Sequence, residues 1–131
     1  MSIVQPQTVA EAEEQLSEPT PRVIELLSKL DGDILVLGVA GKMGPTLARM
    51  ARKSLDQLGR KSKVIGVARF SNATEQQKLE AWNIPTIKAN LLDEKALKNL
   101  PDAPNIVYMA GMKFGSTGNE PLTWAMNAFL P

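Results

Sequence analysis

The sequence predicts an α/β fold, built on a mostly parallel sheet of about four strands with helices on both faces. Short apolar runs alternate with helix-forming stretches along the chain. The first run, Ile34 to Leu37, is apolar throughout, which is typical of a strand covered on both faces in a parallel sheet. A glycine-rich bend follows this run and opens a helix. Because crossovers between parallel strands are right-handed, we expect the strand order 3-2-1-4.

Two short helices are expected before the first strand, as an N-terminal helical extension over residues 1–32. Thr8 and Glu11 have the spacing of a capping box, which predicts the start of the first helix. Thr20 is expected to cap the second helix, with Pro21 at its first position, where the missing N–H costs nothing. The rest of the chain, residues 33–131, is expected to form one further domain.

The elements after the first strand are predicted from apolar spacing and from capping residues. Asn72 and Asp93 are each expected to begin a helix, and Asn83 to end one in the left-handed conformation. We expect strands at 63–67, 86–89 and 105–109, helices at 45–58, 72–82, 93–100 and 121–130, and a polar, glycine-rich loop at 113–119.

The composition excludes several classes of function. The chain has 131 residues and a formal net charge of +1, which gives no electrostatic argument for a nucleic acid or an anionic membrane. It contains neither histidine nor cysteine, so the commonest general base and the commonest soft metal ligands are absent. No apolar stretch is long enough to span a bilayer, and the N-terminus lacks a signal-peptide pattern. We therefore expect a cytoplasmic protein with no metal site.

The glycine-rich bend is the strongest functional motif. Gly38, Gly41 and Gly44 form G-x-x-G-x-x-G between a buried strand and a helix. In this context the first glycine permits the turn, the second lets the backbone approach a pyrophosphate, and the third lets the helix pack closely on the strand. The amides of residues 40–44 would then face an anion at the helix N-terminus. The alternative is an ordinary tight turn. A P-loop is excluded, because only two residues separate Gly38 from Gly41-Lys42 and Met43 follows.

The end of the second strand indicates which dinucleotide would bind. An acidic residue there would hold the ribose 2′-hydroxyl of NAD, but the sequence reads Ala68-Arg69-Phe70-Ser71. The forked guanidinium of Arg69 suits a 2′-phosphate, and Ser71 can add a hydroxyl donor. The sequence therefore favours NADP, with NAD as the second choice. The alternative is that Arg69 stacks on the adenine or faces water; Phe70 is expected to pack.

These segments resemble the extended short-chain dehydrogenase/reductase superfamily, in particular its NAD-dependent epimerase/dehydratase family. The glycine bend matches that family's G-x-x-G-x-x-G, and Asn90-Leu91 resembles its Asp-Leu segment after the third strand. Met109-Ala110-Gly111 resembles the small residues that lie against the cofactor after the fourth strand, and Asn127 its helical asparagine. The resemblance covers about residues 33–131 and implies a Rossmann-type NAD(P)-binding domain.

The resemblance also implies hydride transfer between a nicotinamide and a substrate, as in an epimerase, dehydratase or other oxidoreductase. The family's Tyr-x-x-x-Lys is absent, since Met112 lies four residues after Tyr108, the only tyrosine. We therefore expect a truncated, catalytically inactive chain without catalytic residues; the alternative is a regulatory NAD(P)-binding module. The expected cofactor-binding residues are Gly38, Ala40, Gly41, Lys42, Met43, Gly44, Ala68, Arg69, Ser71, Asn90, Leu91, Met109, Ala110, Gly111 and Asn127.

Two further expectations concern partners. The fourth strand would have no partner on its outer side, and an exposed edge invites pairing, so we expect self-association through this edge or through the C-terminal helix. Asn127 is the one polar residue of an apolar stretch. It would either orient an active-site water network, as the resemblance implies, or bond to the end of a strand.

Overall fold

The computed structural model describes residues 4–111 and 117–131, and its centre is a four-stranded parallel sheet. The strand order is β3-β2-β1-β4, which confirms the predicted 3-2-1-4 order. In this order, β1 is central and pairs with β2 on one side and β4 on the other. The bounds are β1 (Ile34–Leu37), β2 (Val64–Ala68), β3 (Thr86–Lys88) and β4 (Asn105–Tyr108).

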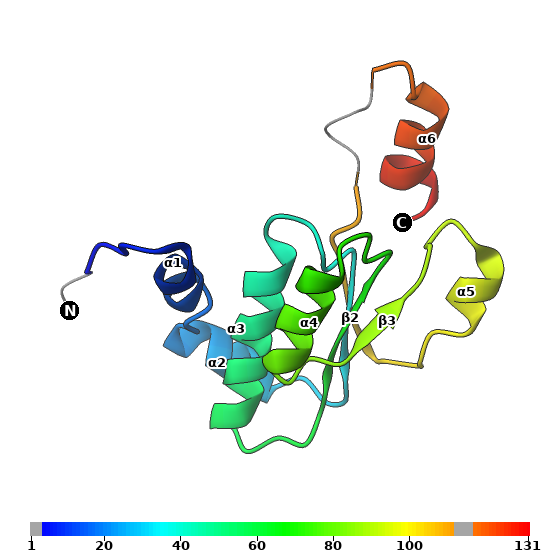
Figure 1. The fold of residues 1–131 in the computed structure, drawn as a ribbon. Helices are drawn as coiled ribbons and strands as arrows, with labels where there is room; N and C mark the ends of the chain where they lie inside the picture. The colour runs from blue at the N-terminus through cyan, green and yellow to red at the C-terminus, as the bar shows by residue number, and fades with distance from the viewer. Residues whose placement is uncertain (1–3, 112–116) are drawn as a thin grey trace.

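One face of the sheet carries the larger part of the core. It is covered by α2 (Pro21–Ser28), α3 (Gly44–Gln57) and α4 (Ala73–Ala81) (Figure 1). Val36 and Val64 from the strands are fully buried here, together with Ala48 of α3 and Leu79 of α4. Because β1 and β2 are buried on both faces, they read as continuous apolar runs in the sequence.

The opposite face is covered less completely. The short helix α5 (Glu94–Lys98) lies on this side, and Leu35, Ile65 and Val67 are buried beneath its flanking loops (Figure 1). At the β4 edge the cover ends, so that Ile106 remains 60% exposed. The expected helix over 93–100 is shorter than predicted, since the chain leaves the helical conformation after its C-cap, Asn99.

The N-terminal extension contains α1 (Val9–Leu16) and α2, both capped as predicted. The hydroxyl of Thr8 accepts a hydrogen bond from the Glu11 amide, and Thr20 accepts one from the Val23 amide. α1 is held against α3 by Glu14, whose carboxylate lies 2.5 Å from the Lys53 ammonium and 2.6 Å from the Arg49 guanidinium. The division into an extension and a domain at residue 33 stays a prediction.

Glu14 shows how polar this attachment is. A hydrogen bond from Lys53 lowers the pKa of Glu14 from its ordinary value, and the charges of Arg49 and Lys53 add to the effect, while burial opposes it. The side chain of Glu14 is 53% exposed, so solvent screens the pair and its contribution to stability is small. The attachment of α1 to α3 therefore combines ion pairs with one fully buried residue, Ser17.

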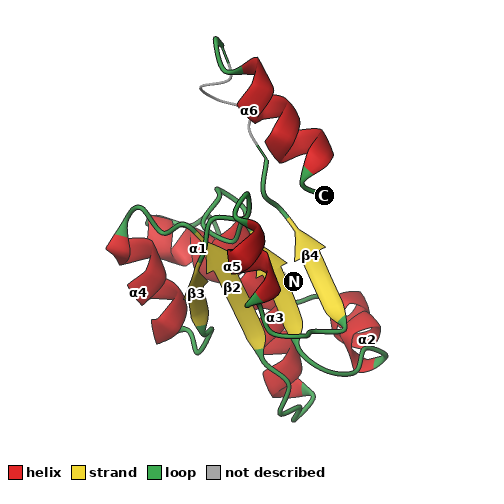
Figure 2. Cartoon of the chain, turned by 90° about the vertical axis from the view of Figure 1, so that its right-hand side faces the viewer, coloured by secondary structure: helices red, strands yellow, loops and turns green. Residues whose placement is uncertain are grey.

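The last helix differs from the prediction. An α-helical turn, α6 (Glu120–Trp124), continues into a π-helical segment, η1 (Ala125–Phe129), and the Leu130 amide donates to the Ala125 carbonyl five residues earlier. Figure 2 shows this helix standing beyond the end of β4, clear of the helices that cover the sheet. The predicted loop at 113–119 falls mainly outside the described residues. Within the described part of the chain, no helix is both long and apolar enough to cross a membrane.

Candidate functional site

A cleft of about 1000 Å³ lies at the carboxyl ends of the strands, where the chain leaves β1 for one side and β4 lies on the other. This is the topological switch point, the place where open α/β sheets bind ligands. Segments that are far apart in the sequence meet here. The lining residues are Gly38, Ala40, Gly41, Lys42, Ala68, Arg69, Phe70, Ser71, Asn72, Glu75, Ala89, Asn90, Leu91, Leu92, Met109, Ala110, Gly111, Leu122, Met126 and Asn127.

The glycine bend forms the floor of the cleft. Gly38 has a φ of +80°, and a Cβ at this position would lie 2.5 Å from the Ala110 amide nitrogen. Both the conformation and the close approach of the next strand therefore require glycine. Gly41 has open space on its Cα, since the nearest heavy atom to an added Cβ, the Gly38 carbonyl oxygen, would be 3.6 Å away. A ligand can therefore approach the backbone closely at Gly41.

Gly44 has a different task. It is buried as the first residue of α3, and an added Cβ would lie 2.0 Å from the Val39 carbonyl oxygen. This contact is between the helix and the end of the strand, so Gly44 supports the bend without lining the cleft. Met43, the N-cap of α3, is 70% exposed and also lies outside the lining. The sequence placed both residues in the site, but the structure brings neither to the cleft.

Positive charge enters the cleft from two segments. Lys42 lies in the glycine bend, just before α3, and Arg69 follows β2; both line the cleft. The N-cap of α3, Met43, makes no side-chain capping bond. The first amides of this helix are consequently left for a ligand or water, and their dipole favours an anion. Together these features give one end of the cleft a preference for an anionic group.

Phe70 shapes the loop between Arg69 and Ser71. It has a φ of +48°, an uncommon conformation for a bulky residue, and its ring is 4% exposed. The side chain belongs to the core beneath α3 and α4, while the residue also lines the cleft. The expectation that Phe70 packs is met, and the burial of its ring holds the loop in its strained conformation.

The segment after β3 forms the opposite side. Asn90 accepts a hydrogen bond on Oδ1 from the Leu92 amide, which fixes the turn and leaves its Nδ2 group oriented by that bond. Leu91 is 6% exposed and belongs to the core of the second face, whereas Leu92 is 40% exposed. This side of the cleft is therefore mainly apolar, with one amide group.

The C-terminal helix supplies the remaining wall through Leu122, Met126 and Asn127. The Tyr108 hydroxyl, at the end of β4, donates a hydrogen bond to the Met126 carbonyl at 2.7 Å. Burial raises the pKa of Tyr108, so the phenol stays protonated at neutral pH. Opposite the helix, a Cβ on Gly111 would lie 3.2 Å from Asn127 Oδ1, so the strand end and the helix approach closely.

Thirteen of the expected residues thus line one cleft, and sequence reasoning missed seven others that do so. Asn72 and Glu75 were identified only as capping residues of α4, although a helix that starts at the carboxyl edge of a sheet places its first turn at the ligand. The contributions of Leu122 and Met126 depend on how the last helix folds back. The missed residues are Phe70, Asn72, Glu75, Ala89, Leu92, Leu122 and Met126.

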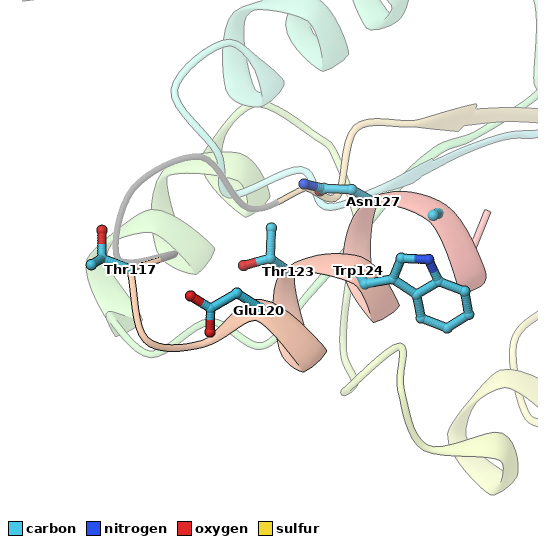
Figure 3. A pocket seen from close by; sticks show the side chains of 6 residues that line it. Thr117, Glu120, Thr123, Trp124 and Asn127 are labelled. Carbon is cyan, nitrogen blue, oxygen red and sulfur yellow. The ribbon is translucent and has the colours of Figure 1, made fainter.

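A second, shallower hollow of about 570 Å³ lies along the same helix (Figure 3). It is lined by Thr117, Glu120, Thr123, Trp124, Asn127 and Ala128. Asn127 borders both hollows, and in Figure 3 the Trp124 ring lies on the other side of the helix from Thr117 and Glu120. No group of three or more acidic side chains that could hold a metal ion occurs among residues 4–111 and 117–131.

Comparison with known proteins gives little beyond the fold. No family model and no curated protein sequence matches the chain. A solved structure titled "cmcI-D160 Mg-SAM" is similar at 20% identity with a TM-score of 0.38; the match covers 95% of this chain and 47% of that one. At this identity and score the likeness assigns no ligand to this chain.

The functional expectations drawn from the sequence are nevertheless corrected. The matched structure's title names Mg and SAM and no nicotinamide dinucleotide, which contradicts the expected hydride transfer, the NADP cofactor and the epimerase, dehydratase and oxidoreductase assignments. The physical reason is that the glycine bend and the switch point determine where a ligand lies, while the same sheet serves unrelated cofactors and reactions. The resemblance to the dehydrogenase/reductase superfamily stays a prediction.

Proposed function

We propose that the chain binds a nucleoside-containing small molecule with an anionic group, in the cleft at the carboxyl edge of the sheet. The observation that carries the proposal is the meeting of the glycine bend, Lys42 and Arg69 in one cleft of about 1000 Å³ at the switch point. That volume lies at the upper end of the range for cofactor and drug-sized ligands, and its mainly apolar walls are typical of such sites.

Each part of the cleft suits one part of such a ligand. The anionic group, a carboxylate or a phosphate, lies at the bare N-terminus of α3 beside Lys42. A planar base lies against the apolar side near Leu91. The hydroxyls of a ribose meet acceptors on Asn72 and Glu75 at the start of α4. The described residues provide these contacts without a recognisable nucleophile–base pair, so the proposal concerns binding and assigns no reaction.

Calorimetric titration of the purified chain tests the proposal. S-adenosylmethionine and S-adenosylhomocysteine probe a carboxylate-bearing nucleoside, and ADP probes a phosphate-bearing one. We expect at least one to bind, and Arg69→Ala to weaken that binding by about tenfold, because a charge-assisted hydrogen bond contributes about 1.5–3 kcal/mol. The exposed Arg22 on α2 provides the control, so Arg22→Ala is expected to bind as the wild type does.

The outcomes separate the alternatives. Binding of S-adenosylmethionine without ADP identifies a carboxylate site, and the reverse identifies a phosphate site. NADPH is included as the comparison ligand, since a clear preference for it over the other probes would reverse the correction made above. If none of these compounds binds, the proposed function is wrong.

We also infer that the chain self-associates through the outer edge of β4. Strand β4 pairs with β1 on one side only, and no strand of the described residues pairs with its other side. Its residues, Asn105 to Tyr108, include no lysine, proline or bulge, which are the usual means of protecting a strand edge. Ile106 adds an exposed apolar side chain.

Sedimentation velocity at increasing concentration tests this inference. We expect a concentration-dependent dimer that Ile106→Lys shifts to the monomer, because a charge on an edge strand opposes pairing. Leu26 of α2 is equally exposed, at 60%, so Leu26→Lys is the matched control and is expected to leave the dimer unchanged. A wild-type chain that remains monomeric at the highest concentration contradicts the inference.

A further inference from the structure

We propose that Tyr108 is a positioning residue for the ligand cleft. Its hydroxyl holds the π turn of the C-terminal helix in place as one wall of the cleft, which couples ligand occupancy to the order of this helix. The proposal rests on the proposed binding function of the cleft. It also rests on three structural observations: an unusual helical register, a single side-chain tether, and the position of that tether beside the cleft.

The π register leaves one carbonyl without a helical partner. In an α-helix the Met126 carbonyl would accept from the Leu130 amide, but Leu130 donates to Ala125 instead, at 2.8 Å. In a π-helix the partner would be residue 131, which is a proline and has no N–H. The Tyr108 hydroxyl takes the place of both, at 2.7 Å from the Met126 oxygen. Tyr108 therefore compensates for the π turn at the position where it occurs.

The tether acts where the helix meets the cleft. Met126, whose carbonyl is held, also lines the cleft, and so do its neighbour Asn127 and Leu122 one turn earlier. The side of the helix away from the cleft is exposed: Trp124 is 62% and Phe129 71% exposed, and their rings stack at 5.7 Å. The helix is thus fixed from the cleft side, by Tyr108 and by Leu130, which packs against the core of the second face.

This arrangement has a defined consequence for binding. π-helical turns are rare and frequently occur at functional sites. A ligand that contacts Leu122 or Met126 adds interactions to a helix with few of its own, so binding orders the helix. Conversely, a helix that is already held by Tyr108 costs the ligand less entropy on binding. Removing the hydroxyl should weaken binding although the hydroxyl itself lies outside the lining residues.

Two measurements test the coupling. In the wild type, hydrogen exchange of the peptide 120–130 is followed with and without ADP and, separately, with and without S-adenosylmethionine. The peptide is expected to become protected by whichever compound gives calorimetric binding. In Tyr108→Phe, which keeps the ring, we expect about fivefold weaker calorimetric affinity, as for the loss of one hydrogen bond, and loss of that protection. Phe129→Leu, on the exposed side of the same helix, is the matched control and is expected to retain both.

Each remaining outcome overturns a specific statement. Tyr108→Phe with wild-type affinity and wild-type protection overturns the positioning role. Calorimetric binding to the wild type without any change in exchange of the peptide overturns the coupling and leaves the proposed function intact. An absence of calorimetric binding by either compound overturns the proposed function and the coupling with it. The exchange experiment on the wild type needs no variant, so a folding defect in Tyr108→Phe does not prevent the test.

Discussion

Gly44→Ala is expected to lower the free energy of unfolding by more than about 4 kcal/mol, which is close to the whole stability of many small domains. The reason is steric. The added methyl group would lie 2.0 Å from the Val39 carbonyl oxygen and 2.6 Å from its carbon, both backbone atoms that cannot move without displacing the start of α3 from the end of β1. Urea denaturation followed by circular dichroism measures the change, and a chain that is already unfolded in buffer meets the expectation.

Gly59→Ala is the matched control. Gly59 also requires glycine for its backbone, with a φ of +65°, but nothing lies within 4 Å of an added Cβ. The substitution is expected to cost only about 1–2 kcal/mol, the price of a left-handed conformation for alanine. Equal losses in the two variants would show that backbone conformation, and not the contact with Val39, dominates at Gly44.

Phe70→Ala is expected to destabilise the fold by about 3–5 kcal/mol, because it empties a ring-sized space in the core. The ring is 4% exposed and packs in the cluster beneath α3 and α4. Phe70 also has a φ of +48°, a conformation that alanine tolerates poorly and glycine adopts freely. Phe70→Gly should therefore be at least as stable as Phe70→Ala, the reverse of the usual order. Thermal unfolding of both variants measures the difference.

The order of the two variants separates two origins of the loop conformation. If alanine is clearly more stable than glycine, the loop has relaxed out of the left-handed region once the ring is gone, and the strain is imposed by the ring alone. If glycine is as stable or more stable, the loop keeps its conformation because the neighbouring strand end and α4 impose it. In the second case Arg69 and Ser71 should hold their positions in the cleft in Phe70→Gly.

The sheet could be predicted from the sequence because its information is local. The buried strands read as apolar runs, and Gly38 and Gly44 mark the turn between β1 and α3. Asn83 was expected to end a helix in the left-handed conformation, and it has a φ of +65°. The parallel order then followed from the alternation of strands and helices, which permits few topologies.

The rest of the site depends on tertiary contacts that no local pattern records. Phe70 adopts a left-handed conformation because its ring is buried, and phenylalanine has no preference for that region. The π turn arises where Pro131 cannot donate and Tyr108, far earlier in the chain, supplies a partner. The chemistry of the ligand was the least accessible part, since the bend specifies a position in the fold and the ligand is selected by the surrounding side chains.

The pairing of β1 with β4 has a consequence for how the chain folds. Strand β1 pairs with β2 after one helical crossover, whereas Asn105, the first residue of β4, bonds to the Asp31 carbonyl 74 positions earlier. Closing so long a loop costs chain entropy before the pairing returns any enthalpy. The β1–β2 unit with α3 can therefore assemble early from nearby contacts, and the attachment of β4 completes the sheet late. A newly synthesised chain thus passes through a state in which both edges of β1–β2–β3 are accessible to chaperones, and the cleft exists only once that last strand has docked.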